Sequence, residues 1–231
     1  MLSEAERIQL KRFHFEDDRR RYLITRALLR TVLSKNVTDD IAPREWTFAV
    51  GAYGRPYITN RHPALRGVSF NISHTKGLVI VALCHDQTLG VDTEAVVNAN
   101  SYFDIVDRYL TSTEITSLKA LSEAERSQRF FEYWTLKEAY IKARGMGLAI
   151  PLNDFSFDFS DLTSVELTIY SRQSDTPERW RFWQFLLRER YLVAVCAQRF
   201  RGWIPEVFMF NTVPLVSQHT LVWSLLRKTR S

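Results

Sequence analysis

The sequence predicts an α+β fold in which each half of the chain packs a helix on an antiparallel sheet. Two observations support this prediction. Segments with helical periodicity and segments typical of strands come in blocks, with a helix and then strands in the first half, and helices and then strands in the second half. The chain has 231 residues, 45% hydrophobic and 13% aromatic, so it can bury a substantial core. We expect the halves to join near residues 95–101.

Composition and charge exclude several classes of protein. A charged fraction of 25% is ordinary for a globular chain and argues against disorder. The longest apolar run, residues 77–84, is too short to span a bilayer, and residues 1–13 contain no apolar signal core. Two cysteines, Cys84 and Cys196, exclude a disulfide framework and predict a reducing cytosol. The net charge of +5 suits nucleic acid, a phosphorylated cofactor or an acidic protein, but charge alone favours a surface with a slight cationic bias.

The N-terminal half begins with a basic segment, residues 7–12, and a helix follows it. Asp17 and Asp18 stand at the helix start, and apolar residues then repeat near the helical period. Five arginines populate the same helix, and we expect most of them on its solvated side: Arg19, Arg20, Arg21, Arg26 and Arg30.

Strands are predicted next along the N-terminal half. Residues 45–50 lead into a turn at 51–56, and residues 68–72 form a strand that ends in a turn at 73–77. Residues 77–84 read as a buried strand, and residues 89–95 read as the next strand of a hairpin or meander.

The C-terminal half begins with helices. Thr111 with Glu114, and Ser122 with Glu125, match the capping box that satisfies the free donors at a helix start. The second box opens a long helix to about Arg144, which glycines then end. Strands return at 155–159, 165–170, 180–187 and 191–197. The apolar tail, 203–231, is expected to contain a short helix after Pro214, and five of its residues are expected to pack on the body: Leu215, Leu221, Val222, Leu225 and Leu226.

The first candidate for chemistry is the acid pair Asp92 and Glu94 on the strand at 89–95. Residues two apart in a strand point to the same face, so these carboxylates converge. Adjacent carboxylates repel unless a cation or proton lies between them, and oxygen ligands of this kind suit Mg²⁺. Two ordinary acids on a solvent-facing strand explain the spacing equally simply, and the pair alone favours that interpretation.

The second candidate is a stripe on the long helix, where Trp134, Glu138 and Lys142 follow one another at steps of four. An acid and an amine at this spacing most often form a surface ion pair of about 0.3–0.5 kcal/mol. The Trp suggests instead that the stripe faces protein, so that Glu138 adds a third carboxylate to a metal site and Lys142 holds a phosphate oxygen.

The third candidate is Ser73 with His74 after the strand at 68–72. Neighbouring residues in a turn rarely form a Ser-His nucleophile, and no Gly-x-Ser-x-Gly elbow is present. Anion binding and local turn hydrogen bonding remain the two interpretations.

Together these motifs resemble the 4′-phosphopantetheinyl transferases of the surfactin-synthetase-activating (Sfp) type. The resemblance covers about residues 5–200, and its motifs stand in the family's order and spacing: Phe70-Asn71-Ile72-Ser73-His74, Gly90-Val91-Asp92-Thr93-Glu94, the stretch from Trp134 to Leu148, and more weakly Gly54-Arg55-Pro56. It implies two similar α/β halves about a pseudo-twofold axis, with coenzyme A and Mg²⁺ at their interface. It also implies transfer of the phosphopantetheine arm to a serine of an apo acyl or peptidyl carrier protein, with release of adenosine 3′,5′-bisphosphate.

The resemblance also implies roles for individual residues. Asp92, Glu94 and Glu138 would be the metal ligands, and Lys142 would reach the pyrophosphate or the leaving phosphate. Ser73 and His74 would contact phosphates of the coenzyme, His74 especially the 3′-phosphate. Further contacts would be basic. Arg55 would take the place of the family's lysine near the adenine nucleotide. The family's N-terminal lysines fall near Glu6 and Gln9 here, and Arg7, Lys11 or Arg12 would substitute for them.

Several points stay open at this stage. The base that takes the serine proton is either Glu138 or a metal-bound water that it orients. Glu114 falls where the family has an acid near the metal waters, but the capping box explains it equally well. A metal-dependent nuclease and a nucleotide- or RNA-binding module are the alternatives, although the nuclease pattern usually places its Lys on a strand.

The predicted organisation has three parts: an N-terminal half at 1–98, a C-terminal half at 99–200 that carries the long helix, and an extension at 201–231. We expect a cytoplasmic monomer whose partners are coenzyme A and a carrier protein, with neither nucleic acid nor membrane among them.

Overall fold

The computed structural model describes residues 2–96, 103–159, 161–170, 175–199 and 205–230. Its helices are α1 (Glu4–Lys11), α2 (Glu16–Asn36), α3 (Phe103–Tyr109), α4 (Ser112–Lys119) and α5 (Glu123–Arg144). Its strands are β1 (Phe48–Val50), β2 (Pro56–Ile58), β3 (Val68–Thr75), β4 (Leu78–His85), β5 (Leu89–Ala95), β6 (Phe155–Asp158), β7 (Glu166–Ile169), β8 (Trp180–Leu187), β9 (Tyr191–Gln198), β10 (Phe210–Val213), β11 (Ser217–Thr220) and β12 (Ser224–Lys228).

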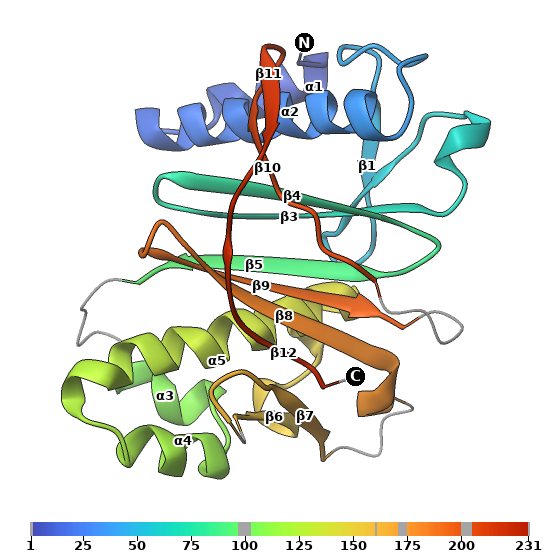
Figure 1. Ribbon diagram of the computed structural model, residues 1–231. Coiled ribbons are helices and arrows are strands. Elements are labelled where there is room, and N and C mark those ends of the chain that lie inside the picture. Colours follow the sequence, from blue (N-terminus) through green and yellow to red (C-terminus); the bar gives the residue numbers. More distant parts are fainter. Residues whose placement is uncertain (1, 97–102, 160, 171–174, 200–204, 231) are drawn as a thin grey trace.

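The elements are stacked in layers (Figure 1). Helices α1 and α2 lie over the β3–β4 hairpin, and below the hairpin lies a four-stranded sheet in the order β12-β8-β9-β5. Helix α5 covers the far side of that sheet, with α3, α4 and the β6–β7 hairpin beyond it. The strand pairs within the described residues are antiparallel, which confirms the α+β prediction. The predicted boundaries at 98/99 and 200/201 fall on residues outside the described part, and the pseudo-twofold symmetry stays a prediction.

Strand β5 belongs to the first half of the chain but forms its sheet with the second half. Its main-chain partner is β9, with Asp92 opposite Ala194. Its other edge faces β3. There the amides of β5 donate to side-chain oxygens of β3 rather than to its main-chain carbonyls. The amides of residues 91, 93 and 95 donate to Asn71 Oδ1 at 3.0 Å, Ser73 Oγ at 3.2 Å and Thr75 Oγ1 at 3.4 Å. We call these three side chains the β3–β5 seam.

The seam corrects two expectations. The strand at 89–95 does not continue a hairpin with the strand before it, because its main-chain partner is β9. The strand predicted at 68–72 runs on through Ser73 and His74 to Thr75, and the turn is confined to Lys76 and Gly77, whose φ is +87°. Ser73 and Thr75 satisfy β5 rather than a local turn, which is why the strand is longer.

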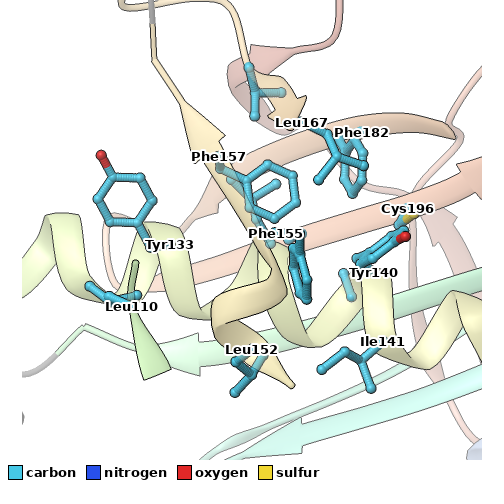
Figure 2. Packing of buried hydrophobic residues seen from close by; sticks show 14 of the residues in the cluster. Leu110, Tyr133, Tyr140, Ile141, Leu152, Phe155, Phe157, Leu167, Phe182 and Cys196 are labelled. Atoms are coloured by element: carbon cyan, nitrogen blue, oxygen red, sulfur yellow. The ribbon is translucent and has the colours of Figure 1, made fainter. Parts of the chain in front are cut away.

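Helix α5 is the largest part of the core beneath the sheet. It begins after the capping box of Ser122 and Glu125 and ends at Gly145, which has φ +69°, as the sequence predicts. Its apolar side packs with β6, β8 and β9 in the cluster of Figure 2, whose rings include Tyr140, Phe155 and Phe182. The Tyr140 and Phe155 ring centroids lie 4.8 Å apart with the rings edge to face, a favourable aromatic geometry. This packing fixes the helix that carries Glu138 and Lys142.

The N-terminal residues form the helix α1, which the sequence analysis did not predict. Residues 7–12 were expected only as a basic segment, but Ser3 and Glu6 form a capping box that begins α1. Glu6 also accepts an ion pair from Arg30 at 2.7 Å, and the Arg30 side chain is 1% exposed. Arg30 is therefore not one of the solvated arginines of α2, because a buried carboxylate on α1 holds it inside.

The C-terminal tail is extended rather than helical. After Pro214 the chain turns at Leu215, with φ +65°, and forms the β10–β11 hairpin against α2. The tail then crosses to the second half, where β12 pairs with β8. Of the five tail residues predicted to pack on the body, Leu221 and Leu226 are partly buried, whereas the other three are exposed: Leu215, Val222 and Leu225. Within the described residues, no helix combines the length and hydrophobicity needed to cross a membrane.

Helix α5 approaches β5 most closely at Gly90. A Cβ built there would lie 2.0 Å from the Ala139 carbonyl oxygen and 2.4 Å from the Ala143 nitrogen, both of them backbone atoms of α5. Gly90→Ala should therefore force the helix and strand apart and lower the free energy of unfolding by about 3 kcal/mol, at the upper end for overpacking. Denaturant titration measures the change. In the control Gly51→Ala, the new Cβ meets only the Arg55 carbonyl oxygen at 3.5 Å, and we expect little change.

Candidate functional site

The site forms where the end of α5 crosses β5. Lys142 Nζ lies 2.6 Å from Asp92 Oδ1 and donates at 3.2 Å to the Val91 carbonyl and at 3.1 Å to Ser73 Oγ. The Asp92 side chain is 7% exposed and that of Lys142 is 27% exposed. The structure thus places residues from three predicted motifs in direct contact, through α5, β5 and the β3–β5 seam.

The charges of Asp92 and Lys142 affect the pKa values of two further carboxylates, Glu94 and Glu138. Burial raises the pKa of Glu138, and the charge of Asp92 raises it further, while Lys142 acts in the opposite direction. Burial also raises the pKa of Glu94, as do Asp92 and, more weakly, Glu138, while a hydrogen bond from Thr75 opposes the shift. Asp92, Glu94 and Glu138 are therefore near enough to disfavour one another's charge, and a cation relieves that repulsion.

The residues fit a hard cation in chemistry. Asp92 Oδ2 is buried and has no hydrogen-bond partner among the described residues, although a buried carboxylate oxygen is costly to leave unpaired. The available donors are carboxylate oxygens, which Mg²⁺ prefers. In the described part of the chain no three His, Cys, Asp or Glu side chains are grouped so that they could hold a metal ion as they stand, and Lys142 supplies the positive charge at Asp92 Oδ1.

A cavity of about 380 Å³ opens beside this cluster. Ser73, His74, Asp92 and Lys142 line one side of it. Ile72 of β3 also lines it, and the remaining lining residues come from the segment before β3, mostly α2: Phe13, Asp18, Arg21, Tyr22, Thr25, Arg26 and Pro56. His74 is exposed, so its imidazole is accessible in the cavity. Positive side chains beside an acid cluster suit a ligand that carries both phosphates and a bound cation.

Sequence reasoning missed the contribution of α2 to this cavity. The sequence predicts that most arginines of this helix are solvated and does not single out Arg21 and Arg26, yet both line the cavity. Arg26 stacks over the Tyr22 ring with 5.2 Å between its guanidinium carbon and the ring centroid, and Tyr22 packs on Phe13. The spacing of Arg21 with Thr25 and of Tyr22 with Arg26 could have indicated them, because residues four apart lie on one side of a helix.

Other predicted site residues lie elsewhere. Lys11 and Arg12 are exposed at the end of α1, next in sequence to Phe13, and neither lines the cavity. The Arg55 guanidinium does not line it either, and donates instead to main-chain carbonyls of α5 and β5. Ser73 lines the cavity, but its hydroxyl already donates to Asp92 and accepts from Lys142 and the Thr93 amide.

Glu114 serves the fold on another side of α5. Its carboxylate accepts from the Thr111 amide in the capping box and from the Phe157 amide at 2.9 Å. It also forms an ion pair at 2.9 Å with Lys137, and both side chains are at most 1% exposed. Because these contacts engage both carboxylate oxygens, the structure favours the capping interpretation of Glu114 over a place near the metal.

Comparison with known proteins covers nearly the whole chain. Residues 1–86 match the family model described as 4′-phosphopantetheinyl transferase, N-terminal, and residues 88–196 match that of the 4′-phosphopantetheinyl transferase superfamily. A 4′-phosphopantetheinyl transferase of Bacillus subtilis is 33% identical over 85% of this chain and 82% of its own. The 4′-phosphopantetheinyl transferase HetI of Nostoc sp. is 27% identical over 90% and 83%. The transferase Sfp of Bacillus subtilis strain 168 is 33% identical over 67% and 65%.

Proposed function

The chain belongs to the 4′-phosphopantetheinyl transferase superfamily and is an enzyme of that type, and we propose that its donor is coenzyme A and its acceptor is a serine of an apo acyl or peptidyl carrier protein. The reaction releases adenosine 3′,5′-bisphosphate and requires Mg²⁺. The observation that carries this proposal is the contact of Lys142 with Asp92 beside a cavity whose lining includes Arg21, Arg26 and His74.

Asp92, Glu94 and Glu138 are proposed to hold the metal. The shared repulsion of their charges and the unpartnered Asp92 Oδ2 support this assignment. When bound there, Mg²⁺ would neutralise charge on the pyrophosphate of coenzyme A and favour departure of the bisphosphate.

The chain's own residues supply the remaining steps. Lys142 stabilises charge that builds on the leaving phosphate. Glu138 has a raised pKa because it is buried, and a base whose pKa is closer to neutral is better suited to take the serine proton. Ser73 holds Lys142 and Asp92 in register. Direct phosphate contacts by Ser73, Lys11 and Arg12 stay predictions from the family resemblance.

His74 is proposed to bind the 3′-phosphate of coenzyme A. His74→Ala should weaken binding of coenzyme A by roughly tenfold or more, the size of a hydrogen bond to a charged group, and should weaken binding of 3′-dephospho-coenzyme A much less. Calorimetry with both ligands measures the difference. His219→Ala, which changes an exposed histidine on β11, is the control. Equal losses for both ligands would reject the 3′-phosphate assignment.

The proposed reaction is tested on an apo carrier protein. The carrier is incubated with the chain, coenzyme A and Mg²⁺, and mass spectrometry should show the added phosphopantetheine. A carrier whose acceptor serine is alanine should gain no mass, and chelation of Mg²⁺ should stop the reaction. An unmodified carrier across a panel of acyl and peptidyl carriers would overturn the proposal, and cleavage of nucleic acid by the same sample would favour the nuclease alternative.

We further propose that the enzyme acts as a cytoplasmic monomer. Both family models match one chain, and Cys84 and Cys196 are free, which suits a reducing compartment. Light scattering in solution and cell fractionation test the two statements.

A further inference from the structure

Arg55 links the first half of the chain to the end of α5. Its backbone is fixed at the start of β2 by a tight turn, in which its carbonyl accepts from the Gly51 amide at 2.9 Å and Gly54 has φ +79°. From there the guanidinium reaches residues far along the sequence. It donates to the carbonyl of Lys142 at 3.2 Å and to that of Ala143 at 3.5 Å.

The same guanidinium also holds β5. Its second terminal nitrogen donates to the Leu89 carbonyl at 3.2 Å. Arg55 forms no ion pair with an acidic side chain in the described part of the chain, so three carbonyl oxygens are its hydrogen-bond partners there. The last carbonyls of a helix lack partners within it and carry partial negative charge, and a cation placed there is stabilising.

The hydrogen bonds of Arg55 lie close to the contact between Lys142 and Asp92. The Lys142 carbonyl accepts from Arg55, and the Lys142 amine contacts Asp92. Leu89 is on the same strand as Asp92, so the guanidinium and the amine join the same helix to the same strand at two places. Gly90, between them, lets the backbones touch.

We propose that Arg55 is a positioning residue that sets the place of Lys142 against β5, and that it acts through the α5 carbonyls rather than through the adenine nucleotide. Gly145 supports this assignment, because a Cβ there would lie 3.2 Å from the Arg55 guanidinium nitrogen and the guanidinium therefore packs on the end of the helix. A planar fork spreads its donors over two terminal nitrogens and can reach carbonyls of the helix and the strand together, whereas an ammonium places all its donors on one nitrogen. The proposal rests on the proposed transfer reaction for its kinetic test only.

The kinetic test compares Arg55→Ala with Arg61→Ala. Arg61 is an exposed arginine in the same half and has no side-chain hydrogen bond or ion pair in the part of the chain that the structure describes. Arg55→Ala should lower kcat for carrier modification by roughly 10- to 100-fold, as loss of an orienting partner does, while the dissociation constant of coenzyme A stays within about threefold. Arg61→Ala should change neither. A loss of affinity as large as the loss of rate, or no loss of either, would overturn the proposal.

A double variant separates positioning from a general structural role. If Arg55 acts through Lys142, adding Arg55→Ala to Lys142→Ala should lower kcat by less than about twofold further, because coupled residues are not additive. Full additivity would reject the proposal. Arg55→Lys keeps the charge but not the fork, and should stay within about threefold of Arg55→Ala in kcat.

Hydrogen exchange provides a readout that needs no activity. In Arg55→Ala, but not in Arg61→Ala, the amides at the end of α5 and the start of β5 should exchange faster, while those of α4 and β8 keep the wild-type rate. Unchanged exchange at α5 and β5 would overturn the positioning role. A wild-type chain that modifies no carrier would refute the proposed reaction. The hydrogen-exchange result would then still test the positioning role of Arg55, because it does not depend on activity.

Discussion

Asp92→Ala is expected to lower the rate of phosphopantetheine transfer by roughly a thousandfold or more while the fold stays intact. The substitution removes a proposed metal ligand. A bound metal stabilises the charge of the transition state by several kcal/mol, and each loss of about 1.4 kcal/mol slows the reaction tenfold. It also removes a negative charge that raises the pKa of both Glu94 and Glu138, so it relieves repulsion in the folded state. Carrier mass spectrometry and thermal unfolding measure the two effects.

Glu94→Ala and Glu138→Ala should show the same loss of transfer with the fold intact. Asp39→Ala changes an exposed aspartate in the loop after α2 and is the control. Full activity in any of the three cluster variants, with Mg²⁺ shown to be required, would remove that residue from the ligand set. A fall in thermal midpoint matching the loss of rate would instead assign the residue to the fold.

Lys142→Ala is expected to lower the maximal rate by roughly 10²-fold or more, as loss of one preorganised charge contact can, while affinity for coenzyme A changes much less. Negative charge builds on the leaving phosphate in the transition state, so the amine contributes more there than in the bound coenzyme. Single-turnover kinetics and calorimetry on the same variant separate rate from affinity.

Lys142→Arg should recover little of this rate, because a planar guanidinium does not fit where a compact ammonium lies between Asp92, Ser73 and the Val91 carbonyl. Lys119→Ala, at an exposed position on α4, is the control. An affinity that falls as much as the rate would make Lys142 a binding residue. No change in either would leave it a simple ion-pair partner of Asp92.

Local signals explain what could be predicted from the sequence. The capping boxes before α4 and α5 and the glycine after α5 determine helix ends within a few residues, so these boundaries were correct. The strand spacing of Asp92 and Glu94 and the helical spacing of Glu138 and Lys142 indicated which side chains share a face. In the structure Asp92 and Lys142 both shift the pKa of Glu94 and of Glu138, which agrees with that spacing. The roles of the carboxylates as metal ligands stay predictions.

Contacts between distant segments explain what could not be predicted. Nothing in residues 73–75 alone shows that Ser73 and Thr75 satisfy the amides of β5, so the strand was ended too early. Arg30 looked like a surface residue until α1 placed Glu6 beside it. The tail contains leucines that suit a helix, yet β8 offers an open edge that β12 fills, and this tertiary contact decides its conformation.

The pairing of β5 with β9 also determines how late during synthesis of the chain the site can form. A ribosome completes β5 and then makes α3, α4, α5 and three further strands before β9 emerges, at roughly 5–20 residues per second. For several seconds or more, Asp92 and Glu94 therefore lie on a strand whose main-chain partner has not yet been made. Nascent chains that stop between residues 145 and 190 should contain both acids, all of α5 and no working site, because β9, the main-chain partner of the strand that carries the acids, is made after them.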